Sequence, residues 1–231
     1  TMKIENLNEV ESKLMGFDAS DYGNGLSINL LYGDKFCVVK GWGLMYYNGK
    51  YWINEGSESF LYMAAINTMK VRGKLALDCE KEQIQKCVGT DNRRVNNAIQ
   101  SFLKMPNLIK SVSDFNSDKD LINADNGILN LRTLEMTDHT PDYNFTYCSK
   151  ARWNPDADSS FFLSWLEKCL GGYEIEEVRE FFQICLGYSL TGHTREEKMF
   201  YIHGAPRAGK GTLVDIIRAI MGEQLAGATA F

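Results

Sequence analysis

A glycine-bearing loop between an apolar run and an amphipathic segment is the feature that most constrains this chain. The run Met199-Phe200-Tyr201-Ile202-His203 precedes the loop, which extends from Gly204 to Thr212, and apolar residues then recur at helical spacing from Leu213 to Ile220. This order predicts a strand, a phosphate-binding loop and a helix. In such a loop the backbone N–H groups and the helix N-terminus bind an anion.

Each residue of this loop is therefore a candidate contact for a nucleotide. The candidates are Gly204, Ala205, Pro206, Arg207, Ala208, Gly209, Lys210, Gly211 and Thr212. Lys210 is the predicted catalytic residue, because its amine would reach the β- and γ-phosphates. A side chain at position 209 would obstruct the wrap of the backbone around them.

The loop departs from the usual pattern G-x-x-x-x-G-K-[S/T] at one position. The usual hydroxyl that holds Mg²⁺ directly follows the lysine, whereas Gly211 stands there and the hydroxyl comes one residue later. Thr212 is therefore the candidate Mg²⁺ ligand. Arg207 either contacts phosphate or points into solvent, and the sequence leaves both open.

A complete ATPase of this class also needs a downstream acidic strand and often an arginine from a neighbouring subunit. Few residues follow Thr212. We therefore expect this chain by itself to bind nucleotide weakly and to hydrolyse it poorly or not at all.

Composition limits the remaining classes of function. A net charge of −5 and a pI near 5.3 argue against a broad basic surface for nucleic acid, although a local basic channel remains open. Arg93 and Arg94 are either such a contact or a solvated helix face. The six cysteines lie far apart, which favours reduced thiols over a metal site or disulfide framework. No apolar run has the length of a membrane span or a secretory signal, so we expect no membrane partner.

The hydrophobic pattern before the loop predicts an α+β fold. A helix is expected over residues 4–15, followed by an antiparallel hairpin whose two-residue turn is Asn48-Gly49. The middle should be largely helical, over residues 58–72 and 80–104, with a break at Gly89-Thr90. The hairpin aromatics are expected to pack within the hairpin rather than to stack on bases. They are Trp42, Tyr46, Tyr47, Tyr51 and Trp52.

Short strands and two further helices are expected after residue 107. A turn at Asp125-Asn126-Gly127 should precede a strand from Ile128 to Leu131. Asp158-Ser159-Ser160 should cap a helix that ends at Gly171-Gly172, and the next helix should run from Glu174 to Leu190.

Three regions follow from these patterns. Residues 1–150 form a mixed α/β region and 151–195 a helical region. Residues 196–231 begin an α/β ATPase domain with the strand, P-loop and helix.

Several short segments precede the loop in a recognisable order. They are Gly33-Asp34-Lys35-Phe36 through Tyr47-Asn48-Gly49-Lys50-Tyr51-Trp52, Asn126-Gly127-Ile128-Leu129-Asn130-Leu131 with Thr140-Pro141-Asp142, Trp153-Asn154-Pro155-Asp156-Ala157, and Phe182 to Leu186 with Gly187-Tyr188-Ser189-Leu190-Thr191-Gly192. With the loop, they resemble the phage and plasmid primase-helicases of the poxvirus primase-helicase type, whose motor is a superfamily 3 helicase.

The resemblance implies a helicase-associated region that precedes an AAA-like motor. It implies ATP and Mg²⁺ as cofactors, single-stranded or forked DNA as partner, a homo-oligomeric ring, and the cytoplasm of a bacterial host. Gly204, Gly209, Lys210 and Thr212 match the family's loop positions, whereas its acidic strand, sensor and arginine finger have no counterpart here. No primase site is evident, and the residues that touch nucleic acid stay unknown.

Two other functions remain open. The sequence G-A-P-x-x-G-K-G-T also resembles the loop of nucleoside monophosphate kinases, but those enzymes begin with this loop, and here most of the chain precedes it. Alternatively, residues 1–195 form a non-catalytic docking, oligomerisation or DNA-binding module.

Overall fold

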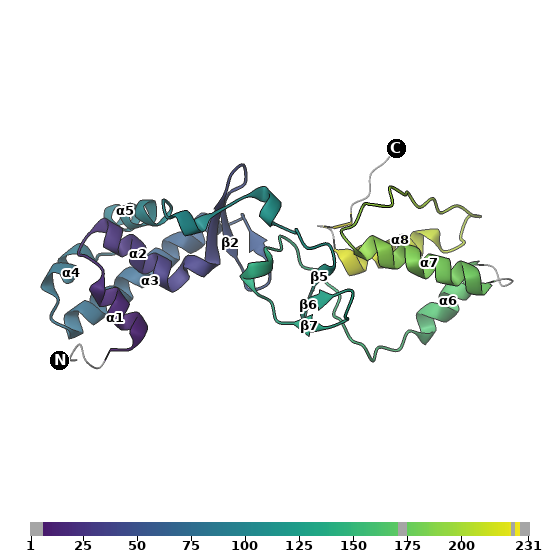
Figure 1. Ribbon diagram of the computed structural model, residues 1–231, viewed down its shortest axis with the longest axis horizontal. Coiled ribbons are helices and arrows are strands. Elements are labelled where there is room, and N and C mark those ends of the chain that lie inside the picture. The colour runs from purple at the N-terminus through teal and green to yellow at the C-terminus, as the bar shows by residue number, and fades with distance from the viewer. Residues whose placement is uncertain (1–6, 171–174, 223–224, 227–231) are drawn as a thin grey trace. The chain divides into compact units, whose positions relative to one another are not determined.

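The computed structural model describes residues 7–170, 175–222 and 225–226 (Figure 1). The chain forms two compact units, the first made of residues 1–48 and 52–115 and the second of 49–51 and 116–231. Helices and antiparallel sheets occur together, with a helical middle, as the α+β prediction requires. The predicted boundaries near residues 150 and 195 stay a prediction.

Among its described residues, the first unit combines five α-helices and three short 3-10 helices, labelled η, with a small sheet. Its elements are α1 (Glu9–Gly16), α2 (Asp21–Tyr32), η2 (Gly33–Lys35), β1 (Phe36–Val39), β2 (Gly43–Tyr47), β3 (Trp52–Ile53), α3 (Ser57–Asp78), α4 (Glu82–Cys87), α5 (Asn92–Phe102), η3 (Pro106–Leu108), β4 (Ile109–Lys110) and η4 (Val112–Asp114).

The second unit pairs a three-stranded sheet with three helices among its described residues. Its elements are β5 (Leu121–Ala124), β6 (Gly127–Asn130), β7 (Met136–Thr137), η5 (Pro141–Tyr143), α6 (Ser160–Leu170), α7 (Ile175–Leu190) and α8 (Lys210–Met221).

The sheet of the first unit has the strand order β3-β2-β1-β4. β2 pairs antiparallel with both β1 and β3, which confirms the predicted hairpin, and β4 pairs parallel with β1. The predicted two-residue turn is wrong, because Tyr47 pairs with Trp52 and leaves four residues in the connection. Within this connection, the Lys50 carbonyl accepts a hydrogen bond from Asn123 Nδ2, and the Lys50 amine donates one to Asp125 Oδ1.

The helix α2 was not predicted, because its sequence contains two glycines and two asparagines that disfavour a helix. Tertiary packing overrides this preference. A Cβ added at Gly25 would lie 2.8 Å from the Cβ of Ser101 and 3.0 Å from the backbone nitrogen of Phe102. The missing side chain therefore allows α2 to approach α5 closely.

The core of the first unit lies between α2, α3 and α5 and against β1. Ile28, Leu61, Val95 and Phe102 are fully or almost fully buried in it. Asp91 caps α5 by accepting a hydrogen bond from the backbone N–H of Arg94, so the predicted break before this helix is confirmed.

A buried arginine connects α3 to the two N-terminal helices. The Arg72 guanidinium has no exposed area and donates to the carbonyl oxygens of Leu14, Phe17 and Asp18 and to Oδ1 of Asn24. Burial lowers the pKa of Arg72. These hydrogen bonds compensate a charge that would otherwise be costly to bury.

In the second unit, the predicted turn at Asp125-Asn126-Gly127 and the strand after it are present, and β6 pairs antiparallel with β5 to form a hairpin. Asp158 accepts a hydrogen bond from the N–H of Ser160 and so marks the predicted start of α6. Its predicted end at Gly171-Gly172, and Glu174, lie outside the described residues. α7 ends at Leu190 as predicted.

Hydrogen bonds connect the segment after α7 to the start of β5. The N–H of Gly192 donates to the carbonyl of Lys119, and His193 Nε2 lies 2.9 Å from Asp120 Oδ1. Hydrogen bonds from Arg132 and then His193 lower the pKa of Asp120. In the part of the chain that the structure describes, no helix is both long and apolar enough to cross a membrane.

Candidate functional site

The loop Gly204–Thr212 lies on the surface of the second unit and leads into α8. The helix begins at Lys210, after Gly209 adopts a left-handed backbone with φ of 84°, and no side chain caps its N-terminus. The first N–H groups of a helix lack partners within the helix, and the helix dipole is positive at this end. The start of α8 therefore suits an anion such as a phosphate.

Lys210 folds back over the loop. Its Nζ donates hydrogen bonds to the carbonyl oxygens of Gly204, at 2.7 Å, and of Ala205, at 2.8 Å. An ammonium group has three hydrogens, so a third remains for a phosphate oxygen. Backbone carbonyl oxygens therefore hold the positive charge of Lys210 at the loop.

Gly209 is constrained from the side of α6 as well as by its backbone. A Cβ at this position would lie 2.5 Å from the Sγ of Cys169 and 3.2 Å from the ring of Trp165. The predicted need for glycine at position 209 therefore has a second cause, which is the close approach of the loop to α6.

The two remaining questions about the loop concern magnesium and Arg207. Thr212 is exposed in the first turn of α8, and a Cβ at Gly211 would meet no atom within 4 Å. Thr212 as a Mg²⁺ ligand stays a prediction. Arg207 is exposed and has a φ of 64°, which is uncommon for a residue with a side chain.

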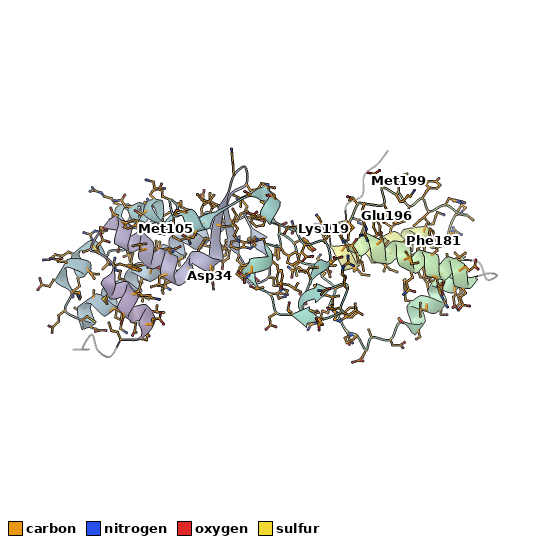
Figure 2. All side chains as sticks on the ribbon, in the orientation of Figure 1. Asp34, Met105, Lys119, Phe181, Glu196 and Met199 are labelled. Carbon is orange, nitrogen blue, oxygen red and sulfur yellow. The ribbon has the colours of Figure 1, made fainter. Side chains whose placement is uncertain are left out.

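The strand predicted for Met199–His203 is not formed. This segment has no strand assignment, and Met199 and Tyr201 are 86% and 80% exposed. Figure 2 labels Met199 on this segment. An extended segment becomes a strand only when a neighbour supplies hydrogen bonds, and no described segment pairs with it. Of the predicted strand–loop–helix unit, only the loop and helix are therefore present among the described residues.

Sequence reasoning missed a polar cluster in the second unit. Lys50 Nζ lies 2.5 Å from Asp125 Oδ1, and Arg152 Nη1 lies 3.4 Å from Asp125 Oδ2. The hydrogen bond from Lys50 is the main cause that lowers the pKa of Asp125. Lys50 and Asp125, with Cys148 and Lys150, line a hollow of about 380 Å³. Residues so distant in sequence gave no local signal.

The two arginines considered for nucleic acid lie at the start of α5. Arg94 forms an ion pair at 3.6 Å with Asp91, the residue that caps this helix. Arg93 is exposed. These positions fit a solvated helix face as well as a nucleic-acid contact, so both interpretations remain open.

Comparison with known proteins gives one family. A family model described as D5 N terminal like matches residues 27–171, which is more than half of the chain. The match begins within α2 and reaches the end of α6, so it does not include the loop Gly204–Thr212. No curated protein matches the chain.

Proposed function

Because the chain belongs to the D5 N terminal like family, which is found at the N-terminus of phage and plasmid primase-helicases, we propose that it is the N-terminal part of an ATP-dependent replication helicase. In the complete protein, hydrolysis at the loop Gly204–Thr212 would drive DNA unwinding. The finer proposal is a motor of superfamily 3, as in poxvirus primase-helicases.

The observation that carries this proposal is the arrangement of Lys210 at the uncapped start of α8. The Lys210 amine lies against the loop carbonyls of Gly204 and Ala205, and no side chain caps the first amides of α8; together these groups offer the charge and donors that a nucleotide phosphate needs. The family match independently connects the preceding residues to DNA replication.

ATP and Mg²⁺ are the proposed cofactors. The loop amides would bind the phosphates, Lys210 would stabilise their charge, and Thr212 would hold the metal. Bound Mg²⁺ would neutralise charge on the phosphate oxygens. The proposed partner is single-stranded or forked DNA, and the proposed assembly is a homo-oligomeric ring in the cytoplasm of a bacterial host.

The test has two parts. Binding of a fluorescent ATP analogue to this chain is measured with Mg²⁺, and ATP hydrolysis by the full-length gene product is measured with and without forked DNA. Lys210→Ala should weaken binding by about tenfold or more, since an ammonium–phosphate contact contributes roughly 1.5–3 kcal/mol. Lys198→Ala, which removes an exposed lysine before the loop, should change neither quantity.

The outcomes separate the competing functions. DNA-stimulated hydrolysis that is lost in Lys210→Ala supports the helicase motor. Phosphate transfer to AMP would instead favour a nucleoside monophosphate kinase. If the full-length product neither binds nor hydrolyses ATP, a docking or assembly module becomes the better account.

A further inference from the structure

A hollow in the first unit has no role in the function proposed above. It lies between β2 and the N-terminal half of α3 and encloses about 360 Å³. This volume falls within the roughly 300–1,000 Å³ that is usual for small-ligand sites. Its lining residues are Tyr32, Lys35, Phe36, Tyr46, Phe60, Met63, Ala64, Ile66, Asn67 and Lys70.

A column of aromatic rings extends from the core to this hollow. Phe102 and Phe36 are buried and meet edge to face at 6.1 Å, and Phe36 lies 5.3 Å from Tyr46. Tyr46 then stacks on Phe60 at 4.4 Å, with only 13° between the ring planes. The column therefore ends at Phe60, whose ring orientation is fixed by stacking on Tyr46.

The outer side of Phe60 is accessible. The residue is 48% exposed although one ring face lies against Tyr46, so part of the ring remains accessible to a further planar group. Met63, one turn later on α3, is 63% exposed and extends the apolar surface. Single exposed apolar residues are common in proteins, but a fixed stacked pair beside a second apolar side chain forms a platform.

The charge around this platform is positive. Lys35 and Lys70 line the hollow, and none of its described lining residues is acidic. Phe60, Met63, Asn67 and Lys70 follow one face of α3, so the aromatic end and the lysine are separated by about 15 Å along the helix. Bases and phosphates of one strand could therefore be contacted together.

A polar group completes the lining. The hydroxyl of Tyr32 accepts a hydrogen bond of 2.6 Å from Nδ2 of Asn67. Because a tyrosine hydroxyl can also donate, its own hydrogen is suited to a phosphate oxygen or a base acceptor. The lining thus offers stacking, positive charge and a donor.

We propose that this hollow binds single-stranded DNA, with a base stacked on Phe60 and phosphates contacting Lys35 and Lys70. The inference rests on the proposed function for its choice of DNA. The ring of Tyr46, which was expected to pack within the hairpin, contacts Phe36 of β1 and Phe60 of α3.

The test is fluorescence anisotropy of a labelled oligothymidylate with this chain, in the absence of nucleotide. Phe60→Ala should lower the affinity about tenfold, and Phe60→Trp should retain it, since either ring can stack. Tyr22→Ala removes an aromatic side chain of α2 that is 59% exposed and lies ten residues before Tyr32, and it should leave binding unchanged. Circular dichroism and thermal unfolding confirm that each variant is folded.

Charge is tested separately. Lys70→Glu should weaken binding and reduce the dependence of log affinity on log salt by about one. Lys86→Glu makes the same change on the exposed surface of α4 and should leave both quantities close to wild type.

Three results would overturn the inference. They are the absence of binding by the wild type, equal affinities for Phe60→Ala and Tyr22→Ala, and equal losses for Lys70→Glu and Lys86→Glu. Because no nucleotide is present, Lys210→Ala should bind the oligonucleotide normally. If the unmodified full-length protein hydrolyses no ATP while the wild-type chain still binds the oligonucleotide, the helicase motor is refuted and this DNA site is retained.

Discussion

α5 in the first unit buries Val95, Ala98 and Phe102 with no exposed area, whereas α7 in the second unit exposes Val178, Phe181 and Ile184 by 48%, 65% and 68%. Both helices carry apolar residues at helical spacing. The difference is that α2 and α3 cover the apolar face of α5, while those three side chains of α7 stay accessible in the described structure. Figure 2 labels Phe181 on α7. Periodicity thus predicts a helix but not what covers it.

The largest expected effect compares one phenylalanine from each helix. Phe102→Ala should destabilise the first unit by about 3–5 kcal/mol, because it opens a cavity in a packed core. Phe181→Ala should change stability by about 0.5 kcal/mol or less. Hydrogen exchange of peptides from each unit, measured by mass spectrometry, separates the two responses. Equal losses would mean that α7 is covered in solution.

The next effect concerns the buried charge of the first unit. Arg72→Met should cost about 3 kcal/mol, because it leaves three carbonyl oxygens and the Asn24 side chain without their donor. Arg93→Met removes an exposed arginine and serves as the control. Chemical denaturation measures both. A loss for Arg72→Met no larger than the control would show that water replaces these hydrogen bonds.

Two glycines in helix interiors should respond with opposite signs. Gly25→Ala forces α2 away from α5 and should destabilise by about 1–2 kcal/mol. Gly187→Ala places a methyl group on α7 where no atom lies within 4 Å, and it should stabilise by about 0.5–1 kcal/mol. Thermal unfolding of the two variants checks the signs. Destabilisation by Gly187→Ala would reveal a close neighbour on that face.

The smallest effect is a pH dependence in the second unit. Lys50 lowers the pKa of Asp125 below its ordinary value of 3.8, so their contact stabilises the fold fully above that pH and progressively less as the pH falls below it. The stability difference between wild type and Asp125→Asn should shrink in acid. Lys50→Met should remove the same dependence. Urea denaturation between pH 7 and pH 2.5 measures this, and a constant difference would contradict it.

The sequence predicted those helices and turns that are determined by residues within or next to them. The start of α5 follows from Asp91 as a cap, and the β5–β6 hairpin follows from the turn at Asp125-Asn126. The parallel pairing of β1 with β4 has no such signal, because these strands are distant in sequence. The local signal for α2 is also misleading, because its glycines and asparagines disfavour a helix while its close packing against α5 favours one.

The candidate loop was predictable in sequence but not in all its contacts. Glycine and lysine spacing identified Gly204–Thr212, and α8 begins at Lys210 as that pattern requires. The contact of Gly209 with α6 and the missing strand at Met199–His203 both depend on which segments lie nearby. Such contacts between segments depend on the tertiary structure, and a single sequence contains no local signal for them.

The tip of the β2–β3 hairpin has a consequence for how this chain can evolve. Residues 49–51 belong to the second unit although the chain on both sides of them belongs to the first. A recombination event that replaced everything after residue 115 would separate Lys50 from Asp125 and Asn123. Exchange of the second unit between related genes is therefore expected to succeed only when residues 49–51 are exchanged with it.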